Sequence, residues 1–439
     1  MMQHAFFALA EQLQDALTGG EVLFATLGAE DSDFVRLNRN RVRQAGHVRA
    51  LALGLQLVDG ERQAEASCDL TGDAAEDLPR ARRLLGRLRE RLGYVPPDPY
   101  LHYCSEPSTG TREVGEPLPA TEQVMEVLTS AAAGLDLVGI WAAGEQVAGL
   151  ASSLGHRHWH ASHSFGLDWS GYLEGDKALA AGYAGLQWDA EVLRGMIDGM
   201  RAGLQVMARP SRSIEPGRYR AYLAPAAVRE LMEMLAWGGF DLESHRTQET
   251  PLLKLIQGER DFDPRIGIRE EQGRGLTPVF TPEGFAKPST ITLIERGQYR
   301  DCLVDARGGR KYGFAVNAAG ETPEALALDA GDLPRSDVLA RLGTGLYIGN
   351  LWYCNWSDPN ECRITGMTRF GTYWVEDGEL VAPVRAMRFD DSLYHLLGDR
   401  LEDLTREREL FISSDTYDGR STDSALLPGV LVSGIELTL

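Results

Sequence analysis

One short segment, His156-Arg-His-Trp-His160 with His163 just beyond it, carries the densest set of side chains that could bind a metal or exchange protons. On a β-strand, the period of two would place His156, His158 and His160 on one face at intervals of about 6 to 7 Å, with the arginine and tryptophan opposite. One ion cannot reach all three imidazoles without a bend in the strand, although two neighbours could share one. A half-exposed strand with incidental histidines is the simpler interpretation, and a metal or acid-sensing site stays open.

Cys354 and Cys362 lie at the two ends of a short polar loop. A disulfide or a two-thiolate metal clip is conceivable, but two free thiols are the simpler interpretation, because there is no second cysteine pair to complete a zinc ribbon. Trp352, Tyr353 and Trp356 give this region aromatic surface. That surface could pack in the core, line a peptide groove or seal a subunit contact.

The segment 225–237 has the start and stop signals of a helix, with Pro225 in its first turn and Gly238-Gly239 after its last. Its apolar residues fall on one helical stripe, which predicts an amphipathic core helix. The members of the stripe are Val228, Leu231, Met232 and Leu235.

The last ninety or so residues contain a series of short motifs in a distinctive order. These are Leu346-Tyr-Ile-Gly-Asn350, Arg363-Ile-Thr-Gly366, Phe370-Gly-Thr-Tyr-Trp-Val-Glu-Asp-Gly378, Val381-Ala-Pro-Val384 and Leu427-Pro-Gly-Val-Leu-Val-Ser-Gly434. The order resembles the C-terminal module of the TldD/PmbA family of peptidase subunits. The resemblance implies an α+β fold of two domains, an N-terminal α+β domain and a strand-rich C-terminal domain.

In active members of that family, a helix at the position of 225–237 bears His-Glu-x-x-x-His, and a later cysteine completes a zinc site that activates water. The best register sets Met232, Glu233 and Trp237 against this motif, so that only the glutamate is kept. No histidine lies between His163 and His245, and the stretch 415–428 has no cysteine. The resemblance therefore implies the TldE/PmbA type of subunit, with no metal of its own and no catalytic residue in this chain.

By the same resemblance, the partner is a TldD-type subunit that supplies zinc and catalysis in a heterodimer, and the substrate is a small or unfolded peptide. This chain would complete the walls of a peptide chamber and offer strand edges to the substrate. A homodimer of the free chain stays open. One alternative is a peptide-binding or scaffold protein with the same fold, and another is an enzyme in its own right with a metal at the histidine strand.

The stretch from Gly238 to Arg274 is polar and poor in regular pattern, and long loops of this kind are often functional. The resemblance places it beside the cleft shared with the partner. His245, Arg246 and Glu249 are therefore candidates for contacting peptide, together with the aromatic residues near 352–356. The sequence leaves open whether Glu233 faces the chamber.

The elements that must position these residues fall into two predicted domains, 1–209 and 210–439, separated by a linker at 210–216 that is rich in proline, serine and arginine. The first domain is predicted to have helices at 4–18, 77–92 and 121–133, and strands at 21–27, 33–37, 48–57, 63–70, 135–141, 146–153 and 156–165, with a turn at Gly144-Glu145. Residues 178–207 are predicted to form one or two helices. The second domain is predicted to be mostly strand around the helix 225–237.

The net charge of −20 disfavours a nucleic-acid partner, because phosphate binding needs clustered cations. The one arginine-rich run, 80–91, alternates with leucines at helical spacing and is interpreted as the solvated face of a helix. No secretory signal and no membrane-spanning stretch are recognised. The five cysteines are odd in number and irregularly spaced, which favours a cytoplasmic location.

Overall fold

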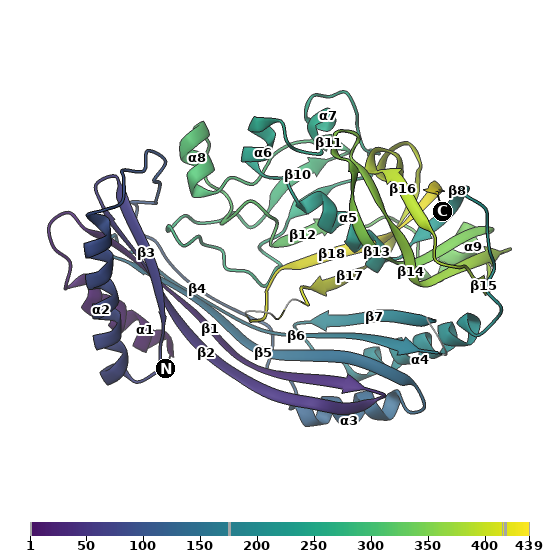
Figure 1. Cartoon of the computed structure of the whole chain (residues 1–439), viewed down its shortest axis with the longest axis horizontal. Coiled ribbons are helices and arrows are strands. Elements are labelled where there is room, and N and C mark those ends of the chain that lie inside the picture. The colour runs from purple at the N-terminus through teal and green to yellow at the C-terminus, as the bar shows by residue number, and fades with distance from the viewer. Residues whose placement is uncertain (1, 174–176, 415, 417–418, 439) are drawn as a thin grey trace.

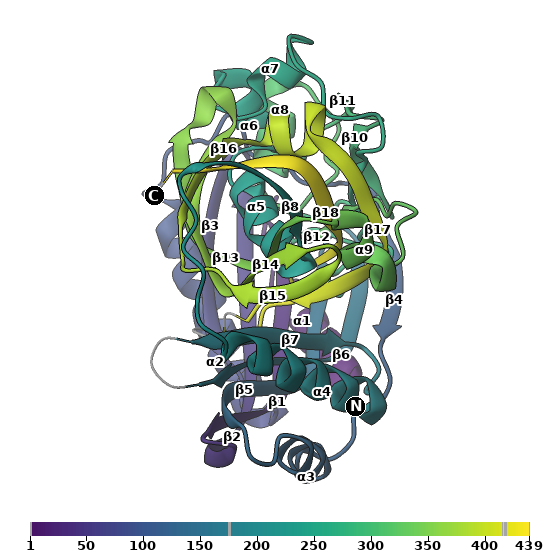
Figure 2. The same cartoon turned by 90° about the vertical axis from the view of Figure 1, so that its right-hand side faces the viewer.

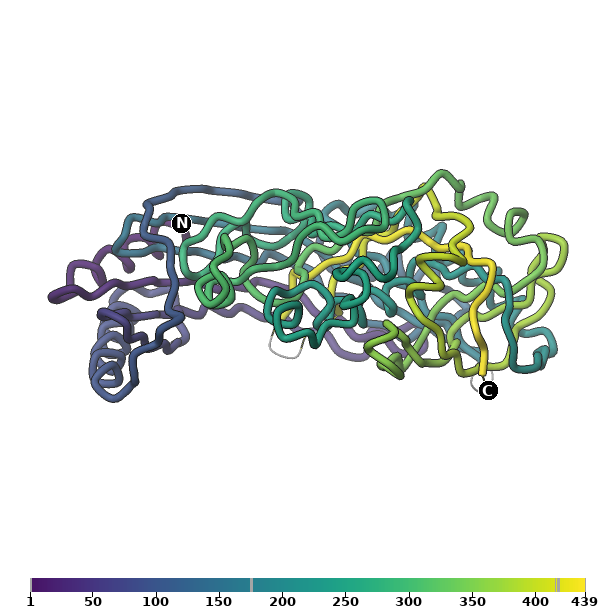
Figure 3. The backbone as a smooth tube through the Cα atoms, turned by 90° about the horizontal axis from the view of Figure 1, so that it is seen from above, coloured from purple at the N-terminus to yellow at the C-terminus, as the bar shows by residue number. Residues whose placement is uncertain are grey.

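Two β-sheets, each with helices packed against it, make up the molecule (Figure 1). The computed structural model describes residues 2–173, 177–414, 416 and 419–438. Within those ranges, no helix combines the length and the apolar character needed to cross a membrane. The two sheets lie against each other along an elongated body (Figure 3), and the predicted α+β class with a strand-rich second part is confirmed.

The first sheet has seven strands among the described residues, in the order β3-β2-β1-β5-β6-β4 with β7 also beside β6. Neighbouring strands are antiparallel except for β4 and β6. The strands are β1 (Val22–Asn38), β2 (Arg41–Asp59), β3 (Arg62–Asp69), β4 (Thr109–Val114), β5 (Asp136–Ser152), β6 (Arg157–Tyr172) and β7 (Ala178–Gly185).

Alternation along the long strands gives this sheet two different faces. Odd-numbered residues of β1, β5 and β6, such as Leu23, Trp141 and Phe165, are buried beneath helices. The even-numbered residues lie on the concave face, which curves toward the second sheet (Figure 1). The covering helices are α1 (Met2–Gln14), α2 (Ala74–Leu92), α3 (Thr121–Ala131) and α4 (Ala190–Met207). Because a strand has a period of two, each strand contributes one row of side chains to the core and one to the concave face.

Three predictions about this half are wrong. The predicted turn at Gly144-Glu145 is absent, because residues 136–152 form one strand, β5, which pairs with β1 and β6 through these two positions. Separate strands at 21–27 and 33–37 are replaced by one strand, β1, which pairs with β2 and β5 along most of its length. The predicted helical run 178–207 is helical only from Ala190, because residues 178–185 pair with β6 as β7. Alanine-rich segments favour helices, but pairing with a formed sheet edge overrides that preference.

The second sheet has eleven strands among the described residues, and its pairings close a ring of β8, β18, β16, β14 and β13. Figure 2 shows this ring around α5. The strands are β8 (Gly217–Leu223), β9 (Ile268–Glu270), β10 (Ile291–Glu295), β11 (Gln298–Tyr299), β12 (Ala325–Leu328), β13 (Gly345–Asp358), β14 (Arg363–Glu376), β15 (Glu379–Pro383), β16 (Arg388–Ser392), β17 (Leu401–Ile412) and β18 (Ser424–Leu437).

The helix α5 is the centre of the second core. Its predicted apolar stripe is confirmed, since Val228, Leu231, Met232 and Leu235 are all at most 1% exposed. The helices of this part are α5 (Pro225–Ala236), α6 (Leu242–Thr247), α7 (Leu253–Ile256), α8 (Ala306–Tyr312) and α9 (Val338–Leu342), with short 3-10 turns η1 (Arg335–Asp337) and η2 (Pro359–Glu361) and a π-type turn η3 (His395–Asp399). The division of the chain at residues 209 and 210 stays a prediction, and it falls in the segment between α4 and β8.

Candidate functional site

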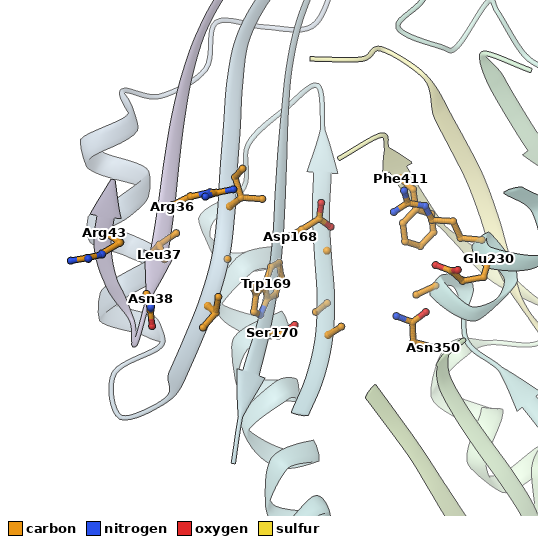
Figure 4. A pocket seen from close by; sticks show the side chains of 18 residues that line it. Arg36, Leu37, Asn38, Arg43, Asp168, Trp169, Ser170, Glu230, Asn350 and Phe411 are labelled. Carbon is orange, nitrogen blue, oxygen red and sulfur yellow. The ribbon is translucent and has the colours of Figure 1, made fainter. Parts of the chain in front are cut away.

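A cavity of about 600 Å³ lies between the concave face of the first sheet and the helix α5 (Figure 4). The sheet contributes Arg36 and Asp168, and the facing wall contributes Glu230, Asn350 and Phe411 from α5, β13 and β17. Because these residues come from both sheets, the cavity exists only when the two parts of the molecule are packed together.

Cross-strand register explains how the sheet wall forms. Arg36 pairs with Ile140, Ile140 with Asp168, and Asp168 with Gly182, so these residues form one row across β1, β5, β6 and β7. A Cβ at Gly182 would lie only 2.9 Å from Asp168 Oδ1. The glycine therefore leaves space for the carboxyl group to reach the cavity.

Burial perturbs both carboxyl groups on the cavity walls. The pKa of Asp168 is raised by burial, against the lowering effects of the Arg229 charge and a hydrogen bond with Ser414. The pKa of Glu230 is raised to about 7 by burial and by the neighbouring charge of Glu233, again opposed by Arg229. A carboxyl group with a pKa of about 7, such as that of Glu230, is partly protonated at neutral pH and can both donate and accept hydrogen bonds, which suits the amide groups of a peptide.

An ion pair between Arg229 and Glu233 lies on the side of α5 that faces the cavity. Arg229 Nε lies 2.6 Å from Glu233 Oε1 at the i, i+4 spacing, and the Arg229 guanidinium lies 5.5 Å from the centre of the Phe411 ring. A second, smaller cavity of about 160 Å³ is lined by Met232 and Glu233 and shares Arg229 and Phe411 with the first. Glu233 therefore faces a cavity next to α5 but is held by an arginine.

The sequence of the second part shows to which protein family the chain belongs. Residues 216–439 match the family model described as the PmbA/TldA metallopeptidase C-terminal domain. The chain belongs to the PmbA/TldD family. No curated protein gives a significant match to the chain.

Three solved structures share the PmbA/TldD fold over nearly the whole chain. TldE from Thermococcus kodakarensis aligns with a TM-score of 0.81 at 13% identity, covering 99% of this chain and 100% of that one. A protein described as a modulator of a DNA gyrase from Thermotoga maritima gives 0.73 at 14% identity, covering 100% and 99%. A similarly described protein from Bacteroides thetaiotaomicron gives 0.72 at 15% identity, covering 98% of each chain. At these identities the likeness concerns the fold.

The metallopeptidase description of the PmbA/TldD family implies a metal, and a catalytic zinc requires three protein ligands from imidazole, thiolate or carboxylate groups. Met232 is buried in the core, Glu233 is paired with Arg229, and Trp237 is 66% exposed just beyond the helix. Burial and the nearby acidic charges raise the pKa of the Cys354 thiol to about 12, which makes it a poor ligand. Among the described residues, no group of three or more His, Cys, Asp or Glu side chains could hold a metal ion. This donor set does not fit zinc.

The cleft residues expected from the PmbA/TldD resemblance lie outside the lining of the large cavity, and their contact with peptide stays a prediction. His245 Nε2 donates to the Gly239 carbonyl oxygen at 2.8 Å, and the Arg246 guanidinium lies 4.7 Å from the Phe314 ring centre. Glu249 is exposed near the end of α6. These three residues gather in the second part, on and after α6.

The aromatic candidates lie on β13. Trp352 is 42% exposed and Tyr353 is 79% exposed, whereas Trp356 packs against the second core. Tyr353 has a φ of 57°, at a register shift between β13 and β14 that turns its ring outward. This part of β13 thus presents two aromatic rings to solvent.

The cavity residues themselves were not singled out by sequence reasoning. Asp168 and Arg36 are single charged residues within strands, and their common row depends on the pairing of β1, β5 and β6. A charged residue at an even position in an otherwise apolar strand was the only signal in the sequence. Asn350, whose buried Oδ1 has no hydrogen-bond partner, stands in the sequence only as the last residue of the motif Leu346–Asn350, with no indication of a cavity.

The histidine strand is buried, so the interpretation as a half-exposed strand is wrong. His156, His158 and His160 are 2%, 8% and 2% exposed, because the segment 276–287 of the second part covers this face of β6. Each ring has its own partner: the Ser152 hydroxyl at 2.6 Å, the Ser108 hydroxyl at 2.8 Å and the Leu276 carbonyl at 2.6 Å, respectively. These histidines are therefore buried in the contact between the first sheet and the segment 276–287.

Acidification is expected to weaken this contact. Burial lowers the pKa of all three rings below 6.5, so the unfolded chain binds protons first as the pH falls. The free energy of unfolding is therefore unaffected by protonation of these histidines above pH 6.5. It decreases as the pH falls toward their pKa values in the folded chain, by up to about 1.4 kcal/mol per pH unit for each histidine. The melting temperature should show this between pH 7.5 and 5.5.

The raised pKa values of Glu230 and Glu270, both about 7, act in the opposite direction, because their folded forms bind protons more readily than their unfolded forms. The informative measurement is therefore the difference between His158→Gln and the parent protein. The variant should lose part of the acid sensitivity, while His47→Gln, at a histidine whose side chain is 55% exposed, should keep it. Equal pH profiles for His158→Gln and the parent would contradict the argument.

Proposed function

We propose that this chain is the TldE-type, non-zinc-binding subunit of a heterodimeric peptidase of the PmbA/TldD family. In this proposal a TldD-type partner supplies zinc and catalysis, and the substrate is a small or unfolded peptide. This chain contributes walls of the chamber in which the peptide is held. Its own contribution is to bind and orient peptide groups through the carboxyl and amide side chains of the large cavity.

One observation carries the proposal. On the helix that in zinc-bearing members would hold the metal, the cavity side presents Arg229, Glu230 and Glu233 in place of imidazoles. The positive charge of Arg229 repels a divalent cation near the motif residues. Glu233, the one residue that matches the zinc-binding motif, is already paired with Arg229. A cavity of this size with polar groups on apolar walls remains suited to binding a ligand.

A cytoplasmic location belongs to the same proposal, supported by the free thiols of all five cysteines. A peptide-binding or scaffold protein without any hydrolytic role is the alternative. The cavity favours it equally, because binding needs only the polar walls. The two proposals differ in what a zinc-bearing partner adds.

The test is zinc content and peptide hydrolysis, measured on this chain alone and after co-purification with a TldD-type chain that carries His-Glu-x-x-x-His. The chain alone, prepared without chelator or metal-affinity resin, should contain close to no zinc and should not hydrolyse an unstructured peptide. The pair should contain about one zinc per heterodimer and hydrolyse the peptide. A glutamine in place of the partner's motif glutamate should abolish hydrolysis and leave the heterodimer intact.

About one zinc bound to the isolated chain, or full activity without the partner, would contradict the subunit proposal. A partner that binds and hydrolyses peptide equally well without this chain would leave the scaffold alternative as the better account.

A further inference from the structure

Another polar cavity, of about 320 Å³, lies on the same concave face as the cavity of about 600 Å³. It is displaced from that cavity by about six residues along the strands. It sits between the sheet and two segments of the second part, 276–278 and 419–422. Its floor is made by two neighbouring rows of the sheet. One row is Ala50, Glu30, Gln146 and Ser162, and the other is Ala52, Gly28, Ala148 and His160.

Four side-chain atoms in these rows are buried and have no hydrogen-bond partner. They are Glu30 Oε1, Gln146 Oε1, His160 Nδ1 and Ser162 Oγ. His160 is 2% exposed and Ser162 is fully buried. Cross-strand neighbours lie about 5 Å apart and alternate residues of one strand about 7 Å apart, so Gln146 lies between Glu30 and Ser162, and His160 lies next to Ser162 along β6. Unpartnered buried polar atoms are rare and costly, and four in the lining of one cavity suit it to a polar ligand.

The hydrogen-bond partners already present fix the chemical character of these atoms. His160 Nε2 lies 2.6 Å from the Leu276 carbonyl oxygen, so Nε2 carries the proton and Nδ1 is an acceptor. Gln146 Nε2 donates to the Arg420 carbonyl, which leaves Oε1 as an acceptor. Glu30 Oε2 accepts the Arg420 backbone N–H at 3.1 Å, and Oε1 is the free carboxylate oxygen. The cavity thus offers three acceptors, one of them charged, and one hydroxyl.

We propose that this cavity binds a primary ammonium group of a peptide, supplied by its amino terminus or by a lysine side chain. An ammonium group carries three N–H donors and no acceptor, which matches three acceptors and a hydroxyl that can also accept. The Glu30 carboxylate supplies the opposite charge. The inference rests on the proposed function, because it names how the peptide substrate would be held.

The second part of the molecule builds one side of the cavity. Gly419 has a φ of +145°, and a Cβ there would lie 3.0 Å from Glu30 Oε2, so a glycine allows the chain to approach the carboxylate. Arg420 also lines the cavity, but the N–H groups of its guanidinium donate to Ser164 and Ser32 in the adjoining row. Glu30 is therefore bonded to a backbone amide in this segment and keeps one oxygen free for a ligand.

Small residues keep the floor open. A Cβ built on Gly28 would meet no atom within 4 Å, and its neighbours in the row are Ala52 and Ala148. Bulky side chains at these positions would fill the space above the sheet. A peptide backbone can therefore lie across the floor while its ammonium group reaches the four polar atoms.

The test compares short peptides binding to the full-length chain by ligand-observed NMR titration. The first probe is tetra-alanine with a free amino terminus, the second is its N-acetylated form, and the third is N-acetyl-Ala-Lys-Ala-Ala. Acetylation should weaken binding at least about tenfold, because it removes the charge and two of the three donors. Recovery with the third probe would assign the site to lysine as well, and no recovery would restrict it to the amino terminus.

Two variants locate the effect. Glu30→Gln keeps an acceptor for the Arg420 N–H but removes the charge, and should weaken the free peptide about tenfold. The matched control is Glu145→Gln, which removes the same charge one residue along β5 from Gln146, on the opposite face beside His163. Ser162→Ala should weaken binding without lowering the melting temperature, because it deletes a buried hydroxyl that has no partner in the free chain.

Equal affinity for free and acetylated peptide, no binding of free peptide up to about 10 mM, or equal effects of Glu30→Gln and Glu145→Gln would overturn the inference. Such results would mean that water fills the cavity. They would leave the proposed function standing, since zinc content and hydrolysis in the heterodimer are measured separately. Conversely, a chain that binds ammonium but never stimulates a zinc-bearing partner would separate this site from the proposed peptidase.

Discussion

Replacing Asp391 by asparagine is expected to lower the free energy of unfolding by about 3 to 5 kcal/mol, the typical cost of breaking a buried ion pair from one side. Asp391 is 1% exposed and joins β16 to β18 and η3. Its Oδ2 accepts from Arg400 at 2.8 Å and from the Glu436 backbone N–H at 2.9 Å, and its Oδ1 contacts His395 Nδ1 at 2.9 Å. An asparagine has one acceptor atom, so its amide nitrogen would face donors and the Arg400 charge would lose its partner.

The measurement is the urea midpoint at unchanged m-value, followed by tryptophan fluorescence. Asp31→Asn is the matched control, since that side chain is 48% exposed and lies 3.4 Å from His47 Nε2 and 3.9 Å from Arg49 Nε. The control should cost less than about 1 kcal/mol. Similar shifts in the two variants would show that Asp391 is not the structural centre of the ring of strands.

Arg420→Met is expected to cost about 2 to 3 kcal/mol and to loosen the contact between the two sheets. The Arg420 side chain crosses from the second part to the first sheet and is 9% exposed. It donates to the Ser164 carbonyl at 2.9 Å, the Ser164 hydroxyl at 2.6 Å and the Ser32 hydroxyl at 3.3 Å. Hydrogen bonds to a charged group contribute about 1.5 to 3 kcal/mol each, offset here by the cost of burying the cation.

Hydrogen exchange provides a local measurement for this variant, since amides of residues 419–424 should exchange faster while those of α5 stay protected. Arg87→Met, which removes the same charge from an exposed position on α2, is the control and should change neither property. Unchanged exchange at 419–424 in Arg420→Met would mean that other contacts hold this segment.

The sequence predicted the α+β class and the position of α5, because these depend on local signals. Pro225, the double glycine after the helix and the apolar stripe each act within a few residues of one another. The large cavity could not be predicted in the same way. Arg36 and Asp168 lie far apart in the chain, and only the pairing of three strands brings them into one row.

The histidine strand shows a second limit. Its period of two correctly placed Trp159 on the face opposite the histidines, in the core under α1. Whether the histidine face was covered depended on the segment around Phe280, more than a hundred residues later, whose ring stacks on His158 at 5.0 Å. Periodicity assigns residues to faces, but the long-range packing that covers a face is not contained in it.

The separation of the two faces of the first sheet has a consequence for variation in this protein. Over much of β1, β5 and β6, odd-numbered residues pack under helices, and even-numbered residues such as Arg36, Asp168 and Gln146 line the cavities. A systematic mutational scan along these strands should therefore alternate residue by residue, with losses of abundance at one position and losses of binding at the next. Such an arrangement lets the ligand preference diverge between relatives while the scaffold that carries it stays intact.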